Sequence, residues 1–146
     1  MNGDAPREFV DANILVYAFD ASSGAKHAVA QQLLERLWDS GGGCLSVQIL
    51  REFFVTVTRK VAKPLPVDEA ADRIREFATW LVFTPTPNDV LAAIELHQQA
   101  QLNFWDAMVV EAAAELGCEI LWTEHLNDGQ LLRAVQVRNP FSVRQN

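Results

Sequence analysis

The chain of 146 residues lacks the sequence features of several common classes of protein. It has two cysteines, Cys44 and Cys118, and neither Cys-x-x-Cys nor His-x-x-x-His spacing occurs, so no zinc site is expected. Both cysteines lie beside apolar residues, which predicts two small buried side chains rather than a disulfide or a metal pair. No apolar run approaches the roughly 20 residues of a membrane-spanning helix. Residues 1–4 show no start of a signal peptide, and we expect a cytoplasmic protein.

Basic residues are also few, with 12 Lys and Arg against 19 Asp and Glu and a net charge of −7. Because Lys and Arg usually contact phosphate groups, this charge argues against tight nucleic-acid binding by bulk attraction. A local basic group, Arg59, Lys60 and Lys63, and bound divalent ions would offset part of the acidic charge. The composition, 49% hydrophobic and 21% charged, is typical of a folded soluble protein, and we expect residues 1–146 to form one domain.

Short apolar segments alternate with segments of helical periodicity, which predicts an α/β domain with a mainly parallel sheet. Strands are expected at 8–11, 44–46, 81–83, 119–123 and 135–137. Helices are expected from 12, at 24–38, from Ser46 to about Lys60, at 68–80, at 90–100 and from Asn103 to Gly117. The tryptophans occupy apolar positions, so we expect them in the core, with Trp105 on the inner side of the last helix: Trp38, Trp80, Trp105 and Trp122.

Three acids stand where a strand ends or a helix begins, and each has a purely structural alternative. Asp11 follows an apolar strand at the rim where such sheets bind ligands, or it caps the next helix. Glu52 falls opposite the apolar stripe of its helix, which favours a solvent-exposed side chain. Asp106 lies three residues after Asn103, either as half of a reciprocal capping pair or as a carboxylate that needs a partner. If Asp11, Glu52 and Asp106 converge, their oxygens suit Mg²⁺ or Mn²⁺, which most often serve phosphate chemistry.

Four short motifs together resemble the PIN-domain ribonucleases, especially the VapC-like toxins of bacterial toxin–antitoxin pairs. They occur in the family's order and spacing over nearly the whole chain. The motifs are Phe9-Val10-Asp11-Ala12-Asn13, Leu50-Arg51-Glu52-Phe53, Trp105-Asp106-Ala107-Met108-Val109 and Leu121-Trp122-Thr123-Glu124-His125. The resemblance implies a three-layer PIN-like domain, with a mainly parallel central sheet flanked by helices.

The resemblance also implies an acidic pocket that binds Mg²⁺ or Mn²⁺. Asp11, Glu52 and Asp106 match the family's first three acids, Thr123 its strand-end hydroxyl, and Asn13 the polar residue after the first acid. The family's fourth acid, usually an aspartate two residues after that hydroxyl, is replaced here by His125. Two neighbouring acids that could substitute for it are Glu124 and Asp128.

The activity implied by the resemblance is hydrolysis of RNA phosphodiesters by a metal-assisted water. Asp11 and Asp106 would hold the cation, Glu52 would orient the water or complete the metal's ligands, and Thr123 would position a water or phosphate oxygen. The implied partners are RNA, a small antitoxin whose tail blocks the pocket, and a second copy of the chain. Because the fourth acid is missing, a PIN-like scaffold that binds RNA or protein without cleaving is the alternative. A phosphotransfer domain is a weaker alternative function, because Asn13 stands where such domains need a second acid.

Overall fold

The structure is a computed structural model that describes residues 5–142. The prediction that residues 1–4 do not start a signal peptide falls outside that range. Six strands form one sheet in the order β3-β2-β1-β4-β6-β5. All neighbouring pairs are parallel except β5 and β6, which are antiparallel. The prediction of a mainly parallel α/β sheet is therefore confirmed. The strands are β1 Glu8–Val10, β2 Gly43–Ser46, β3 Leu81–Phe83, β4 Ile120–Trp122, β5 Leu131–Leu132 and β6 Val135–Arg138.

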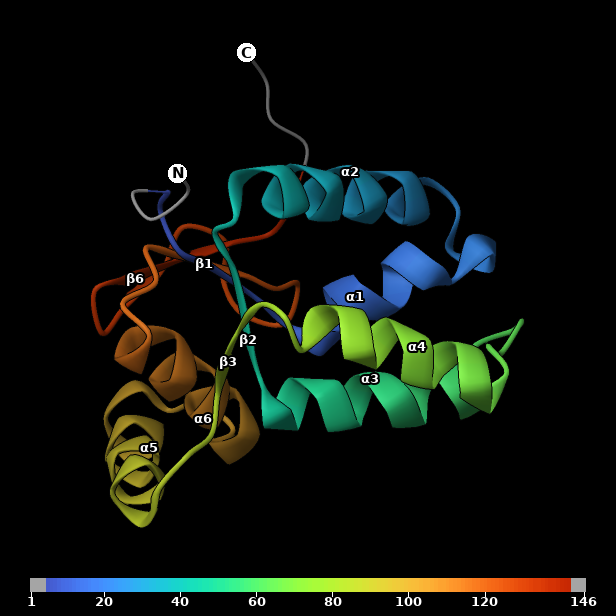
Figure 1. Cartoon of the computed structure of the whole chain (residues 1–146). Helices are drawn as coiled ribbons and strands as arrows, with labels where there is room; N and C mark the ends of the chain where they lie inside the picture. Colours follow the sequence, from blue (N-terminus) through green and yellow to red (C-terminus); the bar gives the residue numbers. More distant parts are fainter. Residues whose placement is uncertain (1–4, 143–146) are drawn as a thin grey trace.

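Helices cover both sides of the sheet, with α2 on one side and α5 and α6 on the other (Figure 1). The helices are α1 Ala12–Phe19, the 3₁₀ turn η1 Ala21–Ser23, α2 Ala25–Ser40, α3 Val47–Arg59, α4 Val67–Phe77, α5 Pro87–Ala100 and α6 Phe104–Glu115. Among the described residues, none of these helices has both the length and the apolar character needed to span a bilayer.

Several helix ends differ from the expected bounds by two or three residues, since α2 continues to Ser40 and α5 begins at Pro87 behind a Thr86 cap. The Ser46 hydroxyl accepts a hydrogen bond from the Ile49 amide at 3.3 Å and begins α3. The helix expected to reach Trp80 ends at Phe77 instead. The turn after it brings the Trp80 ring edge-on to Phe77, at 5.2 Å between centroids, and over Gly43. A Cβ on Gly43 would lie 2.7 Å from that ring, so glycine is required there.

Two tryptophans were wrongly expected in the core, because Trp38 is 42% and Trp105 is 60% exposed. Trp38 stacks on Phe77, with centroids 5.8 Å apart, and contacts Trp80 edge-on at 5.1 Å. Trp105 lies in the first turn of α6, beyond the sheet, and contacts Phe104 edge-on. The two cysteines are buried and form no disulfide, as expected.

The strand β5 was missed because its turn has none of the usual hairpin residues. Arg133 and Ala134 connect β5 to β6 with φ angles of 50° and 63°, a left-handed conformation that side chains disfavour. Arg133 forms an ion pair with the buried Glu111 of α6, and its Nη2 lies 3.6 Å from Glu115 Oε2. These contacts fix the turn against α6, in place of a glycine.

A buried acid in β1 holds three elements together. Glu8, 6% exposed, accepts hydrogen bonds from both Arg36 guanidinium nitrogens, at 2.7 and 3.0 Å, and from Trp122 Nε1 at 2.8 Å. Burial alone would raise the pKa of Glu8, but these hydrogen bonds and the Arg36 charge outweigh it and lower the pKa. The group therefore stabilises the fold above the pKa of an unfolded glutamate, and this contribution is lost as the pH falls through the lowered value.

An Arg36→Met substitution leaves the Glu8 carboxylate buried with only Trp122 as a partner. We expect it to lower the free energy of unfolding at pH 7 by about 2–3 kcal/mol, measured by urea denaturation. The matched control is Arg75→Met, which removes an exposed pair with Asp72 and should cost less than about 1 kcal/mol. Equal losses in the two variants would contradict this role of Glu8.

Candidate metal centre

Asp11 lies at the carboxyl end of β1 and uses its two oxygens differently. Oδ1 accepts a hydrogen bond from the Ala12 amide at 2.8 Å and caps α1. Oδ2 accepts one from the Thr123 hydroxyl at 2.8 Å, and the whole residue is 4% exposed. The two interpretations of Asp11 are therefore compatible, since capping occupies Oδ1, whereas Oδ2 keeps a second lone pair for a ligand beside its bond from Thr123.

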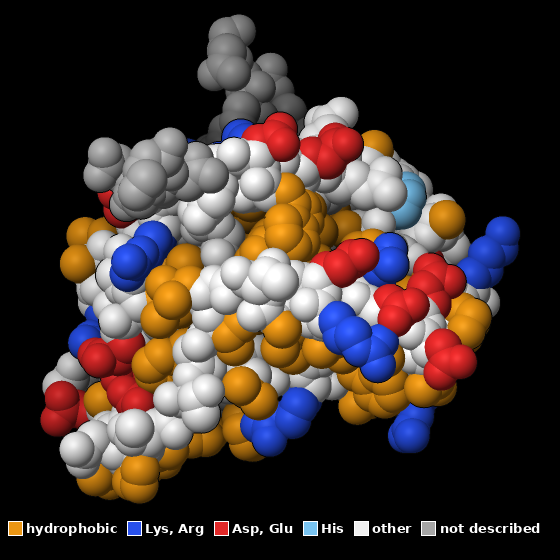
Figure 2. All heavy atoms as spheres, in the orientation of Figure 1, with side chains coloured by type: hydrophobic (Ala, Val, Ile, Leu, Met, Phe, Trp, Pro, Cys, Tyr) orange, Lys and Arg blue, Asp and Glu red, His pale blue; other side chains and the backbone are white. Residues whose placement is uncertain are grey.

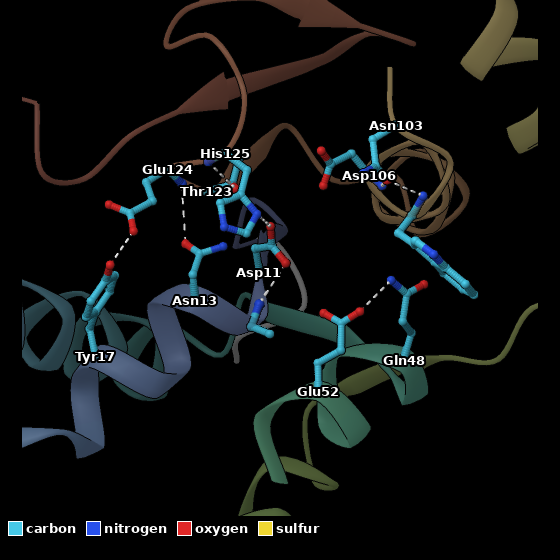
Figure 3. A network of polar contacts seen from close by, with 12 residues as sticks. Asp11, Asn13, Tyr17, Gln48, Glu52, Asn103, Asp106, Thr123, Glu124 and His125 are labelled. Atoms are coloured by element: carbon cyan, nitrogen blue, oxygen red, sulfur yellow. Dashed lines mark hydrogen bonds and ion pairs between the residues drawn. The ribbon is translucent and has the colours of Figure 1, made fainter. Parts of the chain in front are cut away.

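Thr123 fixes the loop after β4, the strand beside β1. It is fully buried, and its amide donates to the Arg138 carbonyl at 3.0 Å. Its hydroxyl donates to Asp11 and accepts from the His125 amide at 3.0 Å. This chain of hydrogen bonds sets the course of the loop so that His125 lies over Asp11 (Figure 3).

Asp106 lies across the site from Asp11, in the first turn of α6. Asn103 Oδ1 caps this helix by accepting from the Trp105 amide at 2.7 Å and the Asp106 amide at 3.3 Å. Among the described residues, no bond from the Asp106 carboxylate back to Asn103 completes a reciprocal pair; this carboxylate points toward the space beside Asp11 (Figure 3). Burial raises the pKa of Asp106, and the negative charge of Asp11 raises it further.

Glu52 was wrongly expected to face solvent. It is half-buried on α3, and its Oε2 accepts a hydrogen bond from Gln48 Nε2 at 3.1 Å. Here the polar side of α3 faces the cavity between β1 and α6. Helical periodicity predicts a polar face, but it does not show whether that face lines a cavity or meets open solvent. Burial raises the pKa of Glu52, the Gln48 bond lowers it, and the charges of Asp11 and Asp106 raise it again.

These side chains line one cavity of about 420 Å³, and no Lys or Arg is among the described residues that form its walls. The lining residues are Asp11, Gln48, Glu52, Asn103, Trp105, Asp106, Val109 and His125. Ligand atoms of Asp11, Asp106 and His125 all lie within 4.8 Å of one another. Glu52 borders the same cavity but is not part of that group.

The other residues predicted near the site are engaged elsewhere. Glu124 turns away from Asp11, accepts from the Tyr17 hydroxyl and forms an ion pair with Lys26 at 2.8 Å. Asp128 Oδ1 accepts from the Asn139 amide at 2.9 Å. Asn13 Oδ1 accepts from the Glu124 amide at 3.3 Å, whereas its buried Nδ2 has no hydrogen-bond partner among the described residues.

The residues present fit a divalent cation. A cation about 2.1 Å from each ligand atom places two such atoms at most about 4.2 Å apart, close to the separations found here. Among the described residues that line the cavity, no Lys or Arg lies beside these carboxylates to neutralise them. A second acidic group, Asp89, Glu111 and Glu115, differs because Arg133 pairs with it.

Comparison with known proteins agrees with this geometry. The PIN domain model matches residues 9–133. No curated protein sequence matches the chain. Solved structures also share the fold. A toxin–antitoxin complex from Klebsiella pneumoniae is 20% identical, with a TM-score of 0.69 over 93% of this chain and 99% of that one.

The second is VapC20 from Mycobacterium tuberculosis, a toxin that cleaves the sarcin–ricin loop, with 23% identity and a TM-score of 0.60 over 78% of this chain and 86% of that one. The third is VapBC2 from Rickettsia felis bound to promoter DNA, with 17% identity and a TM-score of 0.63 over 90% of this chain and 97% of that one. These likenesses establish the fold, and the family model covers most of the sequence. The chain therefore belongs to the PIN-domain family, a family of nucleases.

Proposed function

We propose that this protein is a Mg²⁺- or Mn²⁺-dependent endoribonuclease and the toxin of a toxin–antitoxin pair. The observation that carries the proposal is the convergence of Asp11, Glu52 and Asp106, from the end of β1, α3 and α6, on one cavity. Within residues 5–142, no Lys or Arg lines that cavity. Carboxylates gathered in this way repel one another unless a cation lies between them. The fold shared with VapC-type toxins supports RNA as the substrate.

Each residue has a separate task in this proposal. Asp11 and Asp106 hold the cation, which when bound withdraws charge from the phosphate and makes a neighbouring water more acidic. Glu52 has one oxygen bonded to Gln48, so its Oε1 is left to orient that water and accept its proton. A raised pKa suits Glu52 to this task, since a more basic carboxylate holds the proton better. Thr123 positions Asp11 through its hydroxyl.

A groove beside the cavity supports a single RNA strand as the substrate. It has a volume of about 530 Å³ and shares Glu52 and His125 with the metal centre. Its apolar walls include Val16 and Val61, and Lys60 stands among its lining residues. Lys60 can contact a phosphate near the cleaved one.

The proposed partners are an antitoxin and a second copy of the chain. An acidic cavity attracts a basic antitoxin tail, most strongly at low salt. Exposed apolar side chains of α5 support a homodimer: Val90, Leu91 and Ile94. Figure 2 shows hydrophobic side chains gathered at the lower left, where Figure 1 places this helix. A toxin directed at cellular RNA would act in the cytoplasm.

The proposal is tested by incubating the purified protein with a folded RNA in EDTA, Mg²⁺ or Mn²⁺. We expect no cleavage in EDTA and at least about tenfold faster cleavage when either cation is restored, because the carboxylates then hold their ion. Gel analysis of end-labelled RNA measures the rate, with single-stranded DNA as the substrate control. RNA that binds but is never cleaved with any divalent cation would instead support a non-catalytic scaffold.

A further inference from the structure

His125 occupies the place where the sequence lacks the expected acid, and its position differs from that of an ordinary loop histidine. Its Nδ1 lies 3.8 Å from Asp11 Oδ2. That separation is too long for a hydrogen bond, but it suits two ligands of one ion. His125, Asp11 and Asp106 are also the residues whose ligand atoms lie within 4.8 Å of one another.

Hydrogen bonds of the loop backbone place His125 beside Asp11. The His125 amide donates to Thr123 Oγ1 at 3.0 Å, and the same hydroxyl donates to Asp11. The imidazole is 55% exposed and makes no hydrogen bond in the described part of the chain. It can therefore rotate toward Asp11 without breaking another contact.

The two acids near His125 in the sequence are held away from this position. Glu124 is bound by Lys26 and Tyr17 on the far side of Asn13 (Figure 3). Asp128 accepts from the Asn139 amide. No carboxylate therefore takes the fourth place, and the imidazole is the group that remains.

We infer that His125 is a direct metal ligand, so that Asp11, Asp106 and His125 form a mixed nitrogen–oxygen centre for one transition-metal dication such as Mn²⁺. The inference rests on the proposed metal centre and specifies which ion it prefers. Mg²⁺ is a hard ion that takes oxygen ligands, whereas imidazole binds transition-metal dications. Replacing an aspartate by a neutral ligand also removes one negative charge, which disfavours a second cation in the same cavity.

The test measures metal binding to the whole protein without RNA. Isothermal titration should give tighter binding of Mn²⁺ than of Mg²⁺ to the parent. A His125→Ala variant should bind Mn²⁺ at least about tenfold more weakly, with a much smaller change for Mg²⁺. A His125→Asp variant should lower the ratio of Mn²⁺ to Mg²⁺ affinity by restoring an oxygen ligand. The control is His97→Ala, an exposed histidine on α5, which should change neither affinity.

Electron spin-echo spectroscopy of bound Mn²⁺ gives a readout of the ligand itself. The parent should show coupling to a nitrogen nucleus, and this signal should disappear in both His125 variants. Absence of nitrogen coupling in the parent, or equal Mn²⁺ affinity of parent and His125→Ala, would overturn the inference. The binding and spectroscopic measurements are made without RNA, so they are independent of cleavage. A protein that binds Mn²⁺ through His125 but does not cleave RNA would overturn only the proposed function.

Discussion

An Asp106→Asn variant is expected to cleave RNA about 10³-fold more slowly than the parent and to unfold at a higher temperature. The activity falls because an amide is a poor ligand for the cation. The metal-free fold gains stability because one of three facing carboxylates loses its charge. Burial and the Asp11 charge disfavour ionised Asp106, so removing its charge should raise the free energy of unfolding.

The measurements are RNA cleavage in Mn²⁺ and thermal unfolding in EDTA, and two variants complete the comparison. Asp39→Asn changes an exposed acid on α2 and should leave the rate unchanged. Asp11→Asn should also lose cleavage, but without the gain in stability, because Asp11 accepts hydrogen bonds from both Ala12 and Thr123. An Asp106→Asn protein as active as the parent would show that the observed cleavage comes from a contaminating nuclease or from another site.

The second large effect is a loss of stability between about pH 5 and pH 7 that depends on Glu111. This residue of α6 is 2% exposed. Burial raises its pKa to about 7, with the Arg133 charge acting in the opposite direction and a hydrogen bond with Asp89 adding to the rise. Folded protein therefore keeps a proton on Glu111 in a range where the unfolded chain, with a pKa near 4.5, has lost it.

Because the folded state binds more protons than the unfolded state in that range, the free energy of unfolding decreases as the pH rises. We expect a decrease of roughly 2–3 kcal/mol from this group between pH 5 and pH 8. A Glu111→Gln variant should have a flatter profile, measured by urea denaturation in EDTA at intervals of one pH unit. Glu115→Gln, an exposed neighbour, is the control. Parallel profiles for parent and Glu111→Gln would contradict the assignment.

Much of the fold was predictable because local signals and the tertiary structure agree. Alternating apolar segments and helical periods gave the parallel strands, and Ser46 and Asn103 began their helices as expected. The hairpin of β5 and β6 was not predictable, since Arg133 and Ala134 are held in left-handed conformations by contacts with α6. Trp105 has an apolar position in the helical pattern, but the pattern does not record that its turn extends beyond the sheet.

The site was predictable in part for a related reason. Asp11 follows a strand, so its place at the rim comes directly from the chain order. Glu52 depends on which neighbour faces the polar side of α3, and only the packed structure reveals that neighbour. The role of His125 depends on the Thr123 hydrogen bonds and on the diversion of Glu124 to Lys26. None of these long-range contacts leaves a local pattern in the sequence.

The hydrogen bond between Thr123 and Asp11 joins residues that are 112 positions apart. During synthesis, β1 leaves the ribosome long before its neighbour β4, because the helices α1 to α6 and the strands β2 and β3 lie between them in the chain. An unfinished polypeptide therefore has Asp11 without the hydroxyl that orients it and without the loop that brings His125. The proposed metal centre is therefore complete only after β4 and the loop that follows it have been made.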